Sequence, residues 1–206
     1  MPLSDIHYTL MQVKSICFKK NSFLNPKLWI FLDEDRISDE SSFLSGLPSS
    51  RLIGVIVRTK KKKNLYKKAK LLGKICKLKG FKFYVSSDPL IALSTGADGV
   101  HFSKYSISNR VYSSLSYSCS FHNMSDLRRT RNLKVKKVFI SPIFETSSCK
   151  TKKPVGLTRL SFLSRSLRCE IGVLGGINIK NIKKLRKKKI SYIGGVDIFL
   201  FNKRQV

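Results

Sequence analysis

The chain has 206 residues, enough for one domain of ordinary size or two small ones. Its 41 Lys and Arg residues against 12 Asp and Glu residues give a formal net charge of +29. Hydrophobic residues make up 42% and aromatic residues 10%, which excludes a disordered polyelectrolyte and is ample for a core. No run of eighteen apolar residues occurs, so we expect no membrane-spanning helix and no membrane partner.

Short runs of β-branched and aromatic residues, separated by stretches with helical spacing, predict eight strands. These cover residues 27–33, 52–59, 82–87, 99–102, 116–122, 137–144, 171–177 and 192–200. Helices are predicted between them at 38–45, 61–79, 89–95, 124–133, 157–167 and 179–188. Asn123 and Asn178 stand where they can cap the helices that follow them.

Eight strands alternating with helices predict an α/β protein built as a single (β/α)8 TIM barrel, because so many units in so short a chain favour closure over an open sheet. Residues 1–26 are assigned to an N-terminal extension and residues 27–206 to the barrel. The segment Phe201–Val206 is too short to supply a full eighth helix.

Two compositional features bear on compartment and partner. The early residues contain no uninterrupted apolar stretch and no cleavage-site pattern, and the five cysteines (Cys17, Cys76, Cys119, Cys149 and Cys169) lack C-x-x-C spacing. The scattered cysteines indicate reduced thiols, and both features together indicate a cytoplasmic protein. The lysine runs, such as residues 60–63 and 186–189, would suit a nucleic-acid-binding protein, but no zinc-finger or RNP-type motif accompanies them. We therefore favour compositional drift, with a general attraction for phosphorylated ligands.

In a barrel the reactive groups lie at the carboxyl ends of the strands. Arg58 and Lys60 end the second predicted strand and can grip a pyrophosphate, unless they are only further surface cations. Gly175-Gly176 and Gly194-Gly195 close the last two strands, where backbone N–H groups commonly bind phosphate, although tight turns alone would also explain them.

Other strand ends carry polar side chains. Ser86 ends the third strand, and His122 ends the fifth, where it can transfer protons near neutral pH or simply pack beside a helix. His101 is interpreted as structural. Cys149 beside Lys150 is a candidate reactive thiol without a visible base.

Several segments, in this order and spacing, resemble the thiamine phosphate synthase and TenI family of (β/α)8 barrels. They are ADGVH (97–101), SFHN (120–123), SPIFETSSCK (141–150), VGL (155–157) and LGGINIKNI (174–182). Arg58-Thr59-Lys60 matches the family's Arg-x-Lys strand end, and the resemblance covers roughly residues 27–199.

The resemblance implies a transferase of thiamine biosynthesis that joins hydroxymethylpyrimidine diphosphate to thiazole phosphate and releases pyrophosphate. The partners are then phosphorylated pyrimidine and thiazole molecules. It implies that Ser120 binds the diphosphate, and we expect catalytic roles for Ser120 and for His122, which ends the fifth strand. It also implies that the substrates are bound by Arg58, Lys60, Thr146, Ser148, Gly175 and Gly176. We add Ser86 and Gly195 because they stand at strand ends, and Lys150 because it follows the position of the family's lysine, which Cys149 occupies.

The family's synthases hold Mg²⁺ with two aspartates, but Ser87 and Ser106 stand at those positions here. The expectation of Mg²⁺ as cofactor therefore rests on the adjacent Asp88. The TenI thiazole tautomerase, which needs no Mg²⁺, is the alternative, with His122 as its proton-transfer group. A barrel that binds phosphate ligands without catalysis is a further alternative. A homo-oligomer is compatible with the sequence.

Overall fold

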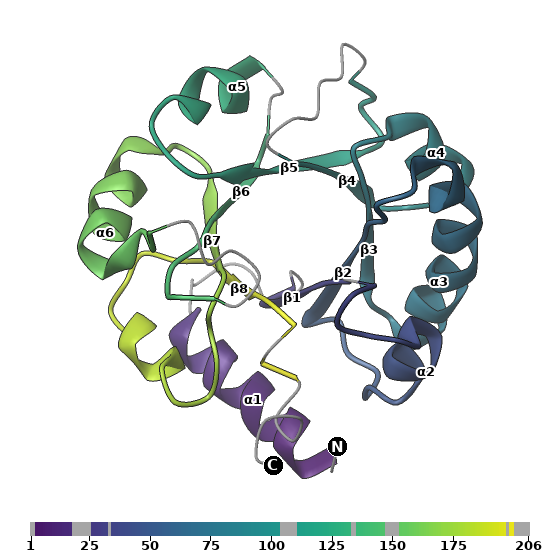
Figure 1. Ribbon diagram of the computed structural model, residues 1–206, viewed down its shortest axis with the longest axis horizontal. Coiled ribbons are helices and arrows are strands. Elements are labelled where there is room, and N and C mark those ends of the chain that lie inside the picture. The colour runs from purple at the N-terminus through teal and green to yellow at the C-terminus, as the bar shows by residue number, and fades with distance from the viewer. Residues whose placement is uncertain are drawn as a thin grey trace.

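The computed structural model describes residues 3–17, 26–32, 34–103, 111–132, 135–146, 153–196 and 198–199. Eight parallel strands pair in chain order, and the last pairs with the first, so the sheet closes into a barrel. Figure 1 shows this ring of strands with helices around its outside. The predicted single (β/α)8 barrel is confirmed.

All eight predicted strands are present. They are β1 (Leu28–Phe31), β2 (Ile53–Val57), β3 (Lys82–Ser86), β4 (Gly99–Phe102), β5 (Ser116–Phe121), β6 (Lys137–Ile140), β7 (Glu170–Leu174) and β8 (Tyr192–Gly194). Most are shorter at the carboxyl end than predicted, and after β6, β7 and β8 this is because apolar residues continue into the loops that follow.

The helices are α1 (Leu3–Ile16), α2 (Glu40–Ser45), α3 (Leu65–Lys79), α4 (Pro89–Ser94), α5 (Asp126–Asn132) and α6 (Gly156–Ser166). Two short 3-10 helices are η1 (Lys62–Asn64) and η3 (Ile182–Leu185). Helix α3 forms as its pattern predicts: Leu65, Ala69, Leu72 and Cys76 share one buried face. It ends at Gly80, whose φ of 70° is the left-handed conformation that glycine adopts without strain. Among the described helices none is long and apolar enough to cross a membrane.

The helix predicted at 179–188 is wrong in length and type. Only the 3-10 helix η3 forms there, and its buried residues Ile182 and Leu185 are three apart, the period of a 3-10 turn. No acid stands in the stretch to offset its run of basic residues, and Lys187 has a φ of 64°, which a helix cannot continue.

Helix α1 lies outside the ring of strands, next to η3, on the side where Figure 1 shows β8 and β1. Ile6, Leu10, Val13 and Ile16 are buried in the same hydrophobic cluster as the outer faces of the strands. It thus lies where a helix after β8 would close the ring. The division into residues 1–26 and 27–206 stays a prediction.

The inside of the barrel is filled with side chains. Trp29, Phe31, Ile56, Tyr84, Phe139 and Tyr192 form a separate buried cluster there. A Cβ on Gly54 would lie 2.5 Å from the Trp29 ring, so glycine is what lets this aromatic layer fit. At the amino end of the strands Lys137 Nζ donates to the Tyr84 hydroxyl at 3.2 Å and lies over the Trp29 ring. The barrel is therefore closed at that end, and a site is expected at the opposite one.

Candidate active site

The predicted site residues gather around one end of the barrel, because the carboxyl ends of parallel strands share one end. The described ones are Arg58 and Lys60 after β2, Ser86 and Asp88 at β3, Ser120 and His122 at β5, Thr146 after β6, Gly175 and Gly176 after β7, and Gly195 after β8. Ser148, Lys150 and Cys149 lie outside the described residues.

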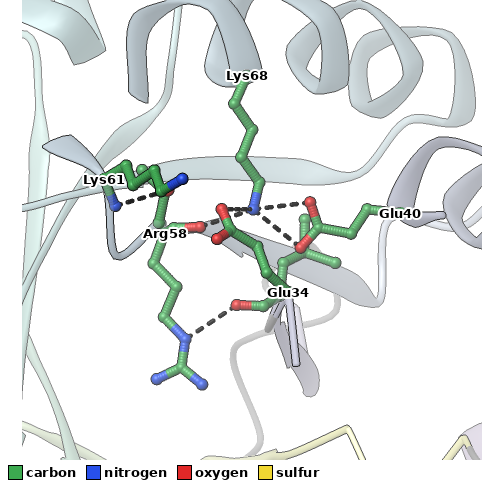
Figure 2. A network of polar contacts seen from close by, with 7 residues as sticks. Glu34, Glu40, Arg58, Lys61 and Lys68 are labelled. Atoms are coloured by element: carbon green, nitrogen blue, oxygen red, sulfur yellow. Dashed lines mark hydrogen bonds and ion pairs between the residues drawn. The ribbon is translucent and has the colours of Figure 1, made fainter. Parts of the chain in front are cut away.

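Arg58 is held at two points. Its Nε donates to the Leu32 carbonyl at 2.9 Å, and its own carbonyl accepts from Lys68 Nζ at 2.8 Å. The guanidinium carbon lies 6.0 Å from the centre of the Phe31 ring, a cation–π contact with the top of the barrel interior. Figure 2 shows the guanidinium pointing away from Lys68. Arg58 is thereby oriented toward the barrel mouth, where an anion would be bound.

Lys60 lies farther out on the same loop. Its Nζ pairs with Asp35 at 2.6 Å, and the two side chains are 73% and 62% exposed. Such an exposed pair is weak, so the ammonium can exchange its partner for a stronger anion at little cost.

His101, which the sequence indicates as structural, is buried inside the barrel beside the candidate site. Its ring is buried, with Nδ1 3.0 Å from Ser118 Oγ and Nε2 3.1 Å from Ser120 Oγ. The ring packs edge-on against Phe31, with centroids 5.1 Å apart. His101 therefore orients the Ser120 hydroxyl. Alternation along the strands was the available signal, since His101 and Ser118 are directly opposed in register and face inward together.

His122 has a defined tautomer. Its Nδ1 lies 2.7 Å from the Ser141 carbonyl, which can only accept, so Nδ1 carries the hydrogen. The neutral ring then keeps its lone pair on Nε2, the state required of a general base. The main-chain N–H of His122 donates to Asp126 Oδ2 at 2.8 Å, which fixes the start of the following turn.

The glycine pair after β7 packs against the loop after β6. The Ile143 N–H donates to the Leu174 carbonyl at 3.0 Å, and the Phe144 N–H donates to the Gly175 carbonyl at 3.1 Å. Gly176 has a φ of 68°, and a Cβ there would lie 2.2 Å from the Glu145 carbonyl oxygen. This close approach already requires glycine, so the role of Gly175 and Gly176 in phosphate binding stays a prediction.

Gly195 differs from that pair. Its N–H donates to the Trp29 carbonyl at 2.9 Å, and no heavy atom lies within 4 Å of its Cβ position. The N–H group of Gly195 is therefore engaged in the barrel ladder, and a role of Gly195 in ligand binding stays a prediction.

The carboxylate of Asp88 caps helix α4. Its Oδ1 accepts from the Ile91 N–H at 3.0 Å. The neighbouring Ser86 and Ser87 hydroxyls lie 3.1 Å apart, and within the part of the chain that the structure describes no three His, Cys, Asp or Glu side chains gather as a metal site. Mg²⁺ prefers carboxylates among several hard oxygen ligands, so these residues do not fit it. Mg²⁺ binding stays a prediction that only a titration can test.

Substitution of Asp88 separates the capping role from the metal role. Asp88→Ala should lower the free energy of unfolding by about 1 kcal/mol, whereas Asp88→Asn should retain stability because asparagine caps as well. Calorimetric titration with Mg²⁺ should give the same result for Asp88→Asn as for the wild type. A metal affinity that is lost in Asp88→Asn would make Asp88 a ligand.

Three of the described thiols, those of Cys17, Cys76 and Cys169, are unsuited to nucleophilic chemistry. Burial raises the pKa of Cys17 and of Cys76 to about 12 and the pKa of Cys169 to about 11. These thiols stay protonated at neutral pH, and only a thiolate attacks. Among the described residues, the site offers cations, hydroxyls and the imidazoles of His101 and His122.

Comparison with known proteins agrees with this chemistry. Residues 44–197 match the family model described as thiamine monophosphate synthase. The putative thiamine-phosphate synthase 2 of Aquifex aeolicus is 27% identical over 184 residues, covering 85% of this chain and 98% of that protein. A thiamine-phosphate synthase of Prochlorococcus marinus subsp. pastoris is 28% identical over 136 residues, which are 64% of this chain and 39% of that longer protein.

A solved structure shares the fold. The thiamine phosphate pyrophosphorylase from Pyrococcus furiosus superposes with a TM-score of 0.66 at 19% identity, covering 84% of this chain and 89% of that one. The segment matched by the family model takes in seven of the eight strands and the loops that carry Arg58, Ser120 and the glycine pair. By this match the chain belongs to the thiamine monophosphate synthase family.

Proposed function

We propose that the protein is a thiamine phosphate synthase, which joins hydroxymethylpyrimidine diphosphate to thiazole phosphate and releases pyrophosphate. The observation that carries the proposal is Arg58, which two hydrogen bonds and the Phe31 ring aim at the mouth of a barrel of this family. A guanidinium placed in this way suits a diphosphate, because its paired N–H groups match two phosphate oxygens.

The reaction requires charge stabilisation more than covalent catalysis. As the carbon–oxygen bond to the diphosphate breaks, the leaving pyrophosphate takes the electron pair, while the thiazole nitrogen supplies the pair for the new carbon–nitrogen bond. Arg58 is already oriented for the developing negative charge, so little reorganisation is needed at that moment. Ser120, whose hydroxyl lies 3.1 Å from His101 Nε2, places a further polar group at the mouth.

The net charge of +29 assists both phosphorylated substrates by long-range attraction, which raises their association rates at low ionic strength. Within the family these substrates are small molecules, so we do not propose nucleic acid as the partner. The protonated thiols of Cys17, Cys76 and Cys169 and the phosphorylated substrates support a cytoplasmic location.

A thiazole tautomerase is the second candidate, and the geometry of His122 favours it. With Nδ1 held by the Ser141 carbonyl, Nε2 is the basic nitrogen of a half-buried imidazole. An isomerisation that moves a proton needs such a group and needs no Mg²⁺.

One assay distinguishes these candidates. Purified protein receives both synthase substrates, with and without Mg²⁺, and pyrophosphate and thiamine phosphate are measured. We expect both products to form together, with none when either substrate is omitted. Isomerisation of a thiazole phosphate carboxylate that disappears in His122→Gln, without any thiamine phosphate, would establish the tautomerase. Phosphate-ligand binding with neither reaction would indicate a barrel without catalysis.

A further inference from the structure

A shielded ionic cluster lies beside Arg58, at the carboxyl end of β2 (Figure 2). Its centre is Lys68, in the first turn of α3, whose side chain is only 13% exposed. Lys68 Nζ lies 3.0 Å from Glu34 Oε1, 2.7 Å from Glu40 Oε2 and 2.8 Å from the Arg58 carbonyl oxygen. An ammonium group has three N–H donors, and each has an acceptor here.

The cluster joins four elements that meet at this corner of the barrel. Glu34 follows β1, Glu40 begins α2, Arg58 follows β2 and Lys68 begins α3. Glu40 is as shielded as Lys68, with 11% of its side chain exposed, so their pair is little screened by solvent. Removal of one member of such a pair leaves the other charge uncompensated, which makes the geometry strongly determined.

Lys68 stands apart from the other lysines of α3. Lys67, Lys70, Lys74 and Lys77 are exposed on the outer face of the helix. Lys68 instead points toward the barrel. A lysine side chain is well solvated in water, so its burial here requires specific partners. Two carboxylates of a chain that has only twelve are placed to receive it.

The cluster fixes the main chain at Arg58 and at the next residue. Lys68 holds the Arg58 carbonyl, and a hydrogen bond links Glu34 with the side chain of Thr59, the next residue. The Thr59 and Lys68 hydrogen bonds lower the pKa of Glu34, so the carboxylate stays charged at neutral pH. With the main chain fixed here, Arg58 Nε can reach the Leu32 carbonyl and its guanidinium the Phe31 ring.

We propose that Lys68 is a positioning residue for the diphosphate of the pyrimidine substrate: by clamping the Arg58 carbonyl to Glu34 and Glu40, it sets the direction of the Arg58 guanidinium. The proposal rests on the function proposed above for Arg58. Lys68 itself does not contact the substrate, because its three donors are engaged within the protein. Small displacements of a binding group lower reaction rates by large factors, so loss of the clamp should weaken binding of the diphosphate.

The test uses Lys68→Met, Lys68→Arg and, as a matched control on the same helix, Lys74→Met, whose lysine is exposed. Two quantities are measured for each: the Kd for inorganic pyrophosphate by calorimetry, and the KM for each substrate in the synthase assay. Lys68→Met should raise the Kd for pyrophosphate and the KM for the pyrimidine diphosphate roughly tenfold, without changing the KM for thiazole phosphate. Lys74→Met should match the wild type.

Two further variants separate positioning from simple loss of stability. In an Arg58→Ala background, Lys68→Met should not weaken pyrophosphate binding further, because no guanidinium remains to be positioned. If Lys68→Met does not fold, Lys68→Arg carries the test. Its planar fork keeps the charge but cannot reproduce three divergent N–H bonds, so we expect a rise in Kd of roughly threefold.

The outcomes for the two proposals are distinguishable. Pyrophosphate binding that weakens in Lys68→Met, in a protein that forms no thiamine phosphate, would sustain the positioning role and overturn the synthase. If the protein forms thiamine phosphate but the Kd for pyrophosphate is unchanged in Lys68→Met, the synthase proposal would be sustained and the positioning role overturned. A similar weakening in the Arg58→Ala background would also overturn the positioning role.

Discussion

Replacement of Arg58 by alanine is expected to lower kcat/KM for thiamine phosphate formation by roughly 10²–10³-fold, because it removes an oriented cation from the leaving pyrophosphate. The loss should fall on the pyrimidine diphosphate and spare the KM for thiazole phosphate. Steady-state measurement of pyrophosphate release, with each substrate varied in turn, checks both statements. Arg58→Lys should recover only part of the rate, since lysine keeps the charge but has no Nε to donate to the Leu32 carbonyl.

Arg51→Ala provides the matched control. Arg51 is an exposed arginine just before β2, so the same charge is removed at the opposite end of the same strand. Its variant should retain wild-type kinetics and differ only in a small salt-dependent change of association rate. Equal losses in the two variants would show that net charge matters and that Arg58 has no place in the site.

Gly176→Ala is expected to have the largest effect on stability, a decrease of about 3 kcal/mol in the free energy of unfolding. Two independent costs combine at this position. The φ of 68° is unfavourable for any residue with a side chain, and the new Cβ would lie 2.2 Å from the Glu145 carbonyl oxygen. Urea denaturation measures the loss, and the displaced loop before Thr146 should also lower synthase activity.

Gly96→Ala separates those two costs. Gly96 has the same φ of 68°, but nothing lies within 4 Å of its Cβ position. Its variant should lose only about 1 kcal/mol, the cost of the left-handed backbone alone. If both alanine variants lost the same amount, the loop after β6 would relax freely, and the close packing of Gly176 would not matter for the site.

The barrel could be predicted from the sequence because each strand carries its own signal in a run of β-branched and aromatic residues. Helix α3 has an equally local signal in the spacing of Leu65, Ala69, Leu72 and Cys76. Other elements depend on contacts far along the chain. Nothing near residues 3–16 indicates that α1 lies beside η3, more than 160 residues later, and the lysine-rich segment around η3 looked more helical than its packing allows.

The candidate site also contains residues with a local sequence signal and residues that depend on long-range contacts. Arg58, Ser86, Ser120 and His122 could be found because strand ends mark the mouth of a barrel. The partnership of His101 with Ser118 and Ser120 required the register between β4 and β5. Lys68 could not be singled out among 41 basic residues, because its inward direction depends on Glu34 and Glu40, about 30 residues earlier.

The position of α1 has a consequence for how the protein is made. This helix precedes every strand of the barrel in the chain, yet η3, which it lies beside, follows it by more than 160 residues. Its apolar face, with Ile6, Leu10 and Val13, is therefore covered only after η3 has been synthesised. Closure of the β1–β8 seam and docking of α1 then form one late, long-range step, and such non-local steps are slow.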